Sequence, residues 1–270
     1  MTRDSSGRLI DPWSVLTVKQ AAVARPFLAE RERESRHLVI YLSGAHAYGF
    51  PSPDSDLDLK CIHLAPTRDL LGLAKVSDPG DRIAVIDGVE LDYGSNELAG
   101  ALRGMIKGNG NYLERLLGEL VLGGDPTLLA EARAVVTPIL SRRVSRHYSG
   151  FAMSQLHLFD AKATAKRALY VLRTAGTGRC LLARGTLHTD IAQLAEFMPA
   201  EIDELVAIKR QAERQELAPA HAAAWRSRLA TAIEAVDAAL AMSVLPDEPP
   251  VEAIAGLDSW LREVRRRNWD

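Results

Sequence analysis

SGAHAYG at residues 43–49, followed by SDLDL at 55–59, places a glycine-rich turn shortly before an alternation of acidic and apolar residues. The apolar run HLVIYL directly before the turn predicts a short buried strand. The alternation, continued through KCIH, predicts a second strand with one buried face. Two strands joined by a loop rich in glycine and proline indicate an α/β unit, and the rest of the chain is interpreted around it.

Two carboxylates lie on the second predicted strand. Asp56 and Asp58 are two residues apart, so both point to one face, whereas Leu57, Leu59 and Cys61 point to the opposite, core-facing side. Like charges this close repel each other unless a cation neutralises them, and oxygen ligands suit Mg²⁺ or Mn²⁺. The backbone N–H groups of the preceding glycine turn can hold phosphate oxygens. A phosphate cradle beside a metal-binding carboxylate pair suits in-line attack on a nucleoside triphosphate.

A third carboxylate is expected from a neighbouring strand. RIAVIDGVELDY at 82–93 predicts two strands around Asp87-Gly88, a dipeptide that favours tight hairpin turns. Glu90 and Asp92 share one face of the second of these strands, and either could orient or deprotonate an attacking hydroxyl. We favour Asp92, at the end of the predicted strand where a site would open, and keep Glu90 as the alternative.

The remainder of the chain has the pattern of amphipathic helices. Helices are predicted at residues 14–35, ELAGALRGMIKG, NYLERLLGELVL and most of 126–242, with breaks at GGDP, AGTG and MPA. This organisation predicts three parts: an α/β core with flanking helices over 1–140, a helical domain over 141–245, and a C-terminal tail with a short helix over 246–270.

The motifs together resemble a known superfamily. An apolar strand, a glycine-containing turn, a spacer and then apolar-flanked Asp-x-Asp is similar to the signature of the DNA polymerase β-type nucleotidyltransferases. Within it, GAHAYGFPSPDSDLDLK at 44–60 resembles the pattern of the predicted nucleotidyltransferases associated with RNA repair ligases, the RlaP family. The resemblance implies an α+β fold, with a small mixed β-sheet core of the polymerase-β palm type and a C-terminal all-helical domain.

The resemblance continues through two further blocks. LDYGSNELAGALRGMIKGNGNYLERLL at 91–117 is similar to that family's aspartate, helix and K-G-N-x-N-x-x-E segment, and KATAKRALYVLRT at 162–174 fits its basic helix. It implies that the catalytic and metal-binding residues are Asp56, Asp58 and Asp92. The nucleotide-binding residues that it implies are Ser43, Gly44, Ala45, Tyr48, Gly49, Lys107, Asn109, Asn111, Lys162 and Lys166, while Glu114 and Arg173 also match the family's segments.

One position departs from the family pattern. Its Gly-Ser is Gly44-Ala45 here, so a hydroxyl that would contact the triphosphate is missing, and Ser43 lies one position early. A lost hydrogen bond of this kind costs about 0.5–1.5 kcal/mol, which weakens nucleotide binding without abolishing it.

Structural roles compete with functional ones at several matched positions. Asn109 and Asn111 are equally suited to capping a helix. Tyr48 is better suited to packing the turn than to stacking on a base. His46, also in the turn, would contact a base or phosphate in a functional role, but a lone histidine is more often incidental.

Charge is unevenly distributed along the chain. The formal net charge of −2, from 33 basic and 35 acidic residues, argues at face value against nucleic acid as a partner. Residues 141–184, however, carry nine basic residues and one acid, whereas 185–261 carry five basic and 13 acidic residues. Lys162, Lys166 and Arg173 share one predicted helical face, and this basic block either contacts a triphosphate or RNA backbone or pairs with the acidic block.

These observations predict a metal-dependent nucleotidyltransferase that moves a nucleoside monophosphate from an NTP to a hydroxyl and releases pyrophosphate. The cofactor would be Mg²⁺ or Mn²⁺. The resemblance implies an RNA end, such as that of a tRNA, as acceptor, and RNA-repair proteins as partners. The alternatives are transfer to a protein or small-molecule hydroxyl, and a non-catalytic RNA- or nucleotide-binding scaffold in which Ala45 marks lost catalysis.

Composition indicates the setting. The 270 residues, 47% hydrophobic and 25% charged, are typical of a globular protein that can bury its own core. The sequence has neither a secretory signal nor an apolar run long enough for a membrane span. Cys61 and Cys180 are too few for a disulfide scaffold and are expected to be buried thiols. We therefore expect a cytoplasmic protein with no membrane partner.

Overall fold

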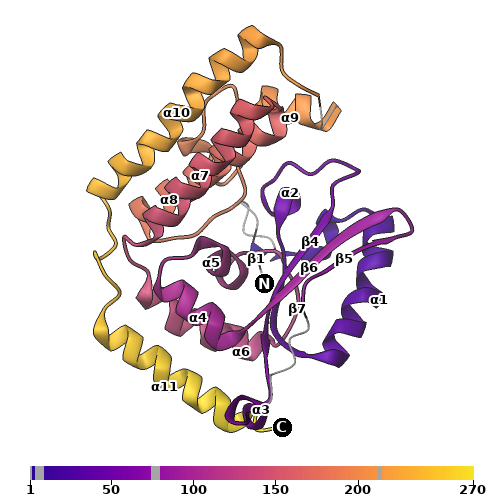
Figure 1. The fold of residues 1–270 in the computed structure, drawn as a ribbon, viewed down its shortest axis with the longest axis vertical. Coiled ribbons are helices and arrows are strands. Elements are labelled where there is room, and N and C mark those ends of the chain that lie inside the picture. Colours follow the sequence, from indigo (N-terminus) through magenta and orange to yellow (C-terminus); the bar gives the residue numbers. More distant parts are fainter. Residues whose placement is uncertain (1, 4–8, 74–79, 212–214) are drawn as a thin grey trace.

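A five-stranded mixed sheet organises the N-terminal half of the structure, a computed structural model that describes residues 2–3, 9–73, 80–211 and 215–270 (Figure 1). Its strands are, in spatial order, β5 (Arg82–Ile86), β6 (Val89–Glu97), β4 (Leu57–Leu64), β3 (Arg36–Leu42) and β7 (Val121–Gly123). β4 and β6 pair in parallel, and the other neighbours are antiparallel. A separate pairing joins β1 (Thr2–Arg3) to β2 (Leu9–Ile10).

The strands predicted around the glycine turn and the hairpin are confirmed. In the hairpin turn, Asp87 has φ +49° and Gly88 φ +74°, the left-handed pair that a tight two-residue turn requires. β4 begins at Leu57, so Asp56 lies just before the strand and not on it. Leu59 and Cys61 are buried on the core face as predicted, in one cluster with Phe27.

Helices cover both faces of the sheet. α1 (Val18–Glu34) packs against the face that carries Leu57 and Leu59. The opposite face packs against α4 (Leu98–Ile106), α5 (Gly110–Leu117) and α6 (Pro126–Val136), through the core cluster that contains Ile62 and Leu64 (Figure 1). Shorter helical turns are η1 (Pro12–Val15), α2 (Gly44–Ala47), α3 (Thr67–Leu71), η2 (Thr137–Ile139) and η3 (Ala195–Phe197).

The second half of the chain is helical, which confirms the predicted α+β class. Its helices are α7 (Val144–Ala161), α8 (Ala165–Arg184), α9 (Ile202–Gln211), α10 (Pro219–Ala241) and α11 (Val251–Arg267). One buried cluster contains side chains from both sides of residue 140, from Leu38 to Trp225. The domain limits at 140 and 245 remain predictions. No helix in the described ranges is long and apolar enough to cross a membrane.

The predicted break at AGTG is wrong, because these residues lie inside α8. All four are buried, and the glycines allow other elements to approach the helix. A Cβ on Gly178 would lie 2.6 Å from Cβ of Tyr148 on α7, and one on Gly176 would lie 2.1 Å from Met198. Small residues here serve helix packing, which the sequence pattern alone does not distinguish from a turn.

The helix predicted through GELVL is also wrong beyond residue 117. α5 ends at Gly118, where a Cβ would lie 2.5 Å from the Tyr41 ring. The chain then pairs with β3: the amide of Leu42 donates to the carbonyl of Leu120 at 2.9 Å, and Tyr41 pairs with Val121. Strand pairing outweighs the helical periodicity of this segment.

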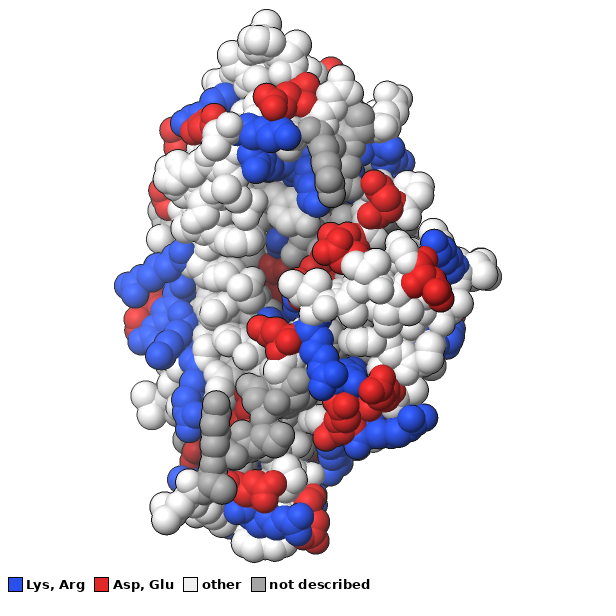
Figure 2. Space-filling view, turned by 45° about the vertical axis from the view of Figure 1, so that its right-hand side comes forward, with Lys and Arg blue, Asp and Glu red and all other residues white. Residues whose placement is uncertain are grey.

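The basic and acidic blocks pair in part, as one of the two alternatives predicts. Four cations of residues 141–184 have ion-pair partners in the acidic block: Arg142 with Asp247, Arg143 with Glu248, Lys162 with Glu216 and Arg184 with Glu196. On the face shown in Figure 2, basic and acidic side chains are interleaved and form no continuous basic surface. Charge in the helical half is therefore mostly balanced locally.

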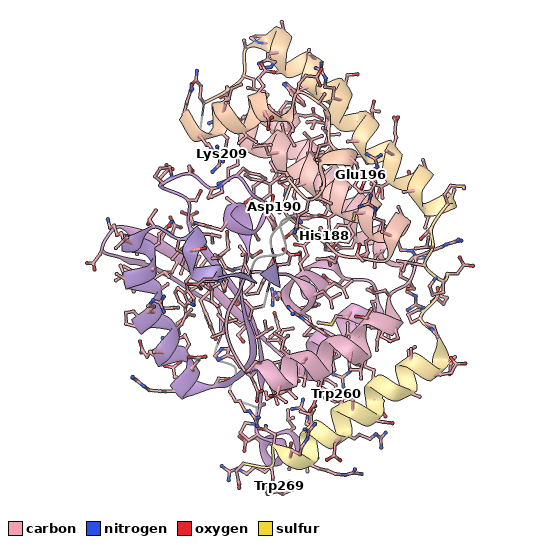
Figure 3. The ribbon with its side chains drawn as sticks, turned by 180° about the vertical axis from the view of Figure 1, so that it is seen from behind. His188, Asp190, Glu196, Lys209, Trp260 and Trp269 are labelled. Carbon is pink, nitrogen blue, oxygen red and sulfur yellow. The ribbon has the colours of Figure 1, made fainter. Side chains whose placement is uncertain are left out.

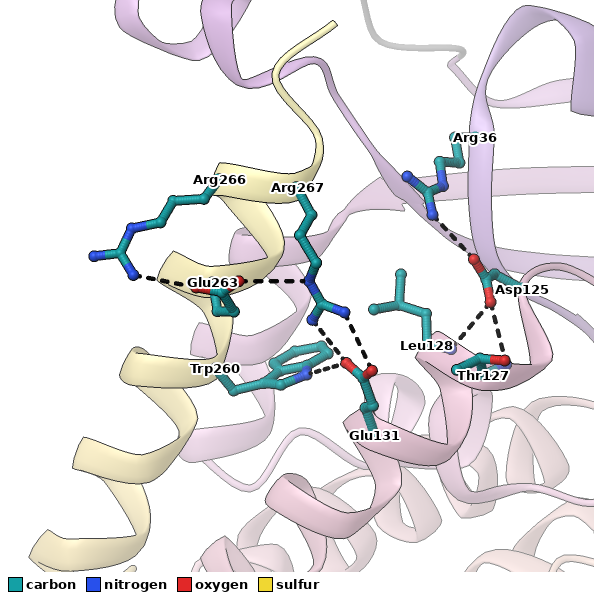
Figure 4. A network of polar contacts seen from close by, with 9 residues as sticks. All are labelled: Arg36, Asp125, Thr127, Leu128, Glu131, Trp260, Glu263, Arg266 and Arg267. Carbon is teal, nitrogen blue, oxygen red and sulfur yellow. Dashed lines mark hydrogen bonds and ion pairs between the residues drawn. The ribbon is translucent and has the colours of Figure 1, made fainter.

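The C-terminal segment contains α11, a helix of 17 residues instead of the short one expected. Seen from behind, Trp260 lies where α11 meets α6 (Figure 3). Its indole Nε1 donates to Glu131 of α6 at 3.0 Å, and Arg267 pairs with the same carboxylate at 2.8 Å (Figure 4). These contacts fix α11 along the sheet-covering helices.

Gly178→Ala tests the close packing of α7 on α8. The added methyl group would overlap Tyr148, so the free energy of unfolding should fall by about 1–3 kcal/mol. Gly256→Ala on α11 is the matched control, because no atom lies within 4 Å of its new Cβ. It should raise the free energy of unfolding by about 0.5–1 kcal/mol through helix propensity. Urea unfolding measures the free energy of unfolding of both variants. Equal changes in the two would contradict the close packing of α7 on α8 at Gly178.

Candidate active site

Parallel pairing of β4 and β6 places Asp58 directly beside Asp92. Glu90, the alternative third carboxylate, precedes Leu91, the first residue of β6 that pairs with β4, and it is exposed. The register therefore brings Asp92, and not Glu90, next to Asp58.

The glycine turn passes directly over the Asp58 carboxylate. The amide of Ser43 donates to the carbonyl of Asp58 at 2.8 Å. Gly44 has φ +65°, and a Cβ there would lie 1.8 Å from Oδ2 of Asp58, so this position requires glycine. Ala45 is buried in the core cluster, which leaves its backbone to contact a phosphate. The Ser43 hydroxyl lies 3.5 Å from the Tyr48 hydroxyl.

Asp58 is a half-buried carboxyl in a cluster of charges. Its pKa is raised from an ordinary 3.8 to about 6, chiefly by burial; the charges of Asp92 and Asp56 contribute to the rise, whereas Lys60 and Lys166 oppose it. Lys60, two residues along β4, donates from Nζ to Oδ1 of Asp92 at 2.6 Å. The carboxylates of Asp58 and Asp92 thus already interact with the ammonium groups of neighbouring lysines.

A cavity of about 420 Å³ opens beside Asp54 and Asp56, on the loop that precedes β4; its lining does not include Asp58, Asp92 or the glycine turn. Residues of α7, of α8 and of the turn between them line the rest. The lining residues are Asp54, Asp56, Gln155, Leu158, Lys162, Thr164, Lys166, Arg167 and Tyr170. The structure therefore brings Lys162 and Lys166 to the same cavity as Asp56, although more than 100 residues separate them in sequence. Arg167 joins them and was not predicted.

The segment around Lys107 is not brought to this cavity. Asn109 caps α5, its Oδ1 accepting from the amide of Asn111 at 3.0 Å, as the structural alternative predicts. Lys107 is exposed at the end of α4. Within the described residues, the side chains of Lys107, Asn109 and Asn111 make no hydrogen bond or ion pair with Asp58 or Asp92.

Arg173 has a structural role instead of facing the cavity. It is buried and pairs with Glu114 of α5 at 2.7 Å. Its guanidinium lies 3.7 Å from the ring centroid of Tyr48, a cation–π contact. Tyr48 is itself buried and packs edge-on against Tyr170. The ion pair therefore joins α5 and α8 behind the glycine turn.

Two of the site's cations could have been found from the sequence. Lys60 follows Asp58 by two residues on an alternating strand, so period-2 alternation places it on the same face. Arg167 adjoins Lys166. No local pattern, in contrast, indicates which of the nine basic residues of 141–184 reach the cavity.

The carboxylates supply the oxygen ligands that Mg²⁺ or Mn²⁺ takes. As the described residues stand, however, no three His, Cys, Asp or Glu side chains form a group that could hold a metal ion. Lys60 engages Asp92, and Asp56 lies on the loop before β4. The side chains are thus of the type that binds a divalent cation, but the three predicted carboxylates are not arranged around one point.

These features define an α+β protein with adjacent carboxylates beneath a glycine turn. The chain belongs to the RlaP family, described as the RNA repair pathway DNA polymerase beta family, whose model matches residues 22–263. The resemblance inferred from the motifs is confirmed, and the family is one of polymerase β-like nucleotidyltransferases.

An uncharacterized protein of Methanocaldococcus jannaschii is 24% identical over 157 residues, which cover 57% of this chain and 64% of that protein. The match therefore spans less than two thirds of that relative. The solved structure of a nucleotidyltransferase-like protein from Exiguobacterium sibiricum is 12% identical, with a TM-score of 0.33, over 91% of this chain and 79% of that one. This likeness is too low to support an argument.

Asp58→Asn tests the raised pKa of Asp58 without reference to activity. Because the native carboxyl binds its proton more tightly than the unfolded one, the contribution of Asp58 to wild-type stability falls as pH rises from about 4 to about 7, through the folded pKa. The amide variant lacks this loss. The free energy of unfolding of the variant minus that of the wild type should therefore grow over the same interval, and urea unfolding measures it. A difference that stays constant with pH would contradict the raised pKa.

Proposed function

We propose that this protein is a Mg²⁺- or Mn²⁺-dependent nucleotidyltransferase that transfers a nucleoside monophosphate from an NTP to a hydroxyl group. The observation that carries the proposal is the position of Asp58, beneath the glycine turn and beside Asp92. Asp56, two residues before it, lines a cavity together with cations. Membership of a nucleotidyltransferase family supports it.

The cations of the cavity suit a triphosphate. Lys162, Lys166 and Arg167 line it together with Asp54 and Asp56. Ammonium and guanidinium groups neutralise phosphate oxygens, and guanidinium binds them in a bidentate way. The backbone of the turn from Gly44 to Gly49 would hold further phosphate oxygens. In this arrangement the triphosphate lies between the turn and the start of α8.

The acids suit a divalent cation and a proton acceptor. When bound, such a cation neutralises the phosphate oxygens and lowers the barrier to attack. Asp56 and Asp58 would supply its oxygen ligands, and Asp92 would join them by giving up its contact with Lys60. The acceptor oxygen forms a bond to the α-phosphorus, the bond between the α-phosphorus and the bridging oxygen breaks, and pyrophosphate leaves. Asp92 would take the hydroxyl proton.

For the acceptor we propose an RNA end, with RNA-repair proteins as partners in the same process. The description of the family, which names RNA repair, supports this choice. Transfer to a protein or small-molecule hydroxyl is the second candidate, because basic and acidic side chains are interleaved on the face shown in Figure 2. To separate the two candidates, the protein is incubated with each labelled NTP, with Mg²⁺ or Mn²⁺, and with RNA or protein acceptors. The acceptor that becomes labelled identifies the substrate.

Asp58→Asn should reduce nucleotide transfer at least about a hundredfold, because metal-ion catalysis contributes several kcal/mol. Asp69→Asn on α3 is the matched control, since this exposed acid lies at the other end of the molecule (Figure 1), and it should retain wild-type rates. Labelled-nucleotide transfer measures both. Full activity in Asp58→Asn, or no transfer by the wild type to any acceptor, would refute the proposal.

Lys166→Met should raise KM for the NTP several-fold by removing a cation from the cavity. Arg146→Met is the matched control, because Arg146 belongs to the same basic block but is exposed on α7 and does not line the cavity. Steady-state kinetics at two salt concentrations measure the effect, which screening should weaken. Equal changes in the two variants would indicate general electrostatics instead of a triphosphate contact.

A further inference from the structure

Lys209 of α9 is a lysine whose side chain is 0% exposed. Lysine is almost never fully buried unless its ammonium group is paired or hydrogen-bonded, because removing the charge from water is costly. Figure 3 shows Lys209 where the helical half of the chain meets the loop that follows α2. Its hydrogen-bond partners on that loop explain how the ammonium group can be buried.

The ammonium group of Lys209 holds two serines of the loop that leads into the site. Nζ donates to Oγ of Ser52 at 2.7 Å and to Oγ of Ser55 at 3.1 Å. The serines also bind each other: the amide of Ser52 donates to Oγ of Ser55 at 2.9 Å, and the amide of Ser55 donates to the carbonyl of Ser52 at 2.9 Å. Both serines are buried. Asp56 follows Ser55 directly.

The same loop is held from the opposite side by α1. Gln20, which forms a capping box with Thr17, donates from Nε2 to the carbonyl of Ser55 at 3.0 Å. Burial, and then the charge of Lys209, lower the pKa of His46 in the glycine turn to about 4. The loop is thus clamped between α1 and α9.

We propose that Lys209 is a positioning residue that sets the place of Asp56 through Ser52 and Ser55. The inference rests on the proposed function, in which Asp56 is a metal ligand. A carboxylate on an otherwise exposed loop needs such support, because it lies before β4 and no strand pairing holds it. The helical half of the chain would then contribute to the site through a residue that touches neither metal nor nucleotide.

Lys209→Met tests the inference, because it keeps the length of the side chain and removes the ammonium group. Three readouts are needed: amide hydrogen exchange over 52–57, Mn²⁺ affinity of the nucleotide-free protein, and kcat and KM for transfer. We expect faster exchange, Mn²⁺ binding about tenfold weaker, and kcat lower by about ten- to a hundredfold, since small misplacements are costly. KM for the NTP should change less than kcat, because the cavity cations are untouched.

Arg210→Met is the matched control, an exposed cation at the next position of α9. It should match the wild type in all three readouts. If exchange rises in Lys209→Met while Mn²⁺ affinity and kcat equal those of the control, the clamp is only structural and the inference is overturned. It is equally overturned if no readout changes. If the wild type neither binds Mn²⁺ nor transfers nucleotide, the proposed function fails instead.

A double variant keeps the test valid if Lys209→Met alone does not fold. Replacing both partners of a buried hydrogen bond by apolar groups can be nearly neutral for stability. Lys209→Met combined with Ser52→Ala keeps the Ser55 hydroxyl that accepts from the Ser52 amide. It should therefore regain a cooperative thermal transition without regaining Mn²⁺ affinity or kcat. Wild-type kcat in a folded double variant would overturn the positioning role.

Discussion

The carboxylate of Asp58 occupies the space that a side chain at position 44 would fill, and the arrangement of the site follows from this close approach. Gly44 can take φ +65° and leave that space empty, so the turn lies directly on β4. The bond from the amide of Ser43 to the carbonyl of Asp58 locks the two together. Asp58 is thereby held half-buried beside Asp92, and its raised pKa is the electrostatic consequence.

Buried cations connect the helical half of the chain to this turn and its loop. Arg173 pairs with Glu114 and lies over Tyr48 at the end of the turn, and Lys209 holds the serines before Asp56. These charges do not contribute to a surface for nucleic acid. Several other members of the basic block pair with neighbouring acids, and the cations that line the cavity are the ones placed to meet a triphosphate.

Much of the fold could be predicted because its signals are local. Alternation along β4 and the Asp87-Gly88 turn depend on neighbours in sequence, and both are found where expected. The adjacency of Asp58 and Asp92 required only that two predicted strands pair in register. The AGTG segment was mistaken for a break because small residues suit a turn and a close helix contact equally well, and only the position of Tyr148 distinguishes the two.

By itself, the sequence determined the α+β class, the family, the strand that carries Asp58 and the glycine turn before it, since each depends on residues a few positions apart. Only the tertiary structure decided which cations reach the site. Lys166 lies at the cavity, Arg173 is buried against Glu114, and Lys209 clamps the loop. Their partners are far away in sequence, and the burial that decides whether a charge pairs or faces a ligand exists only in the folded chain.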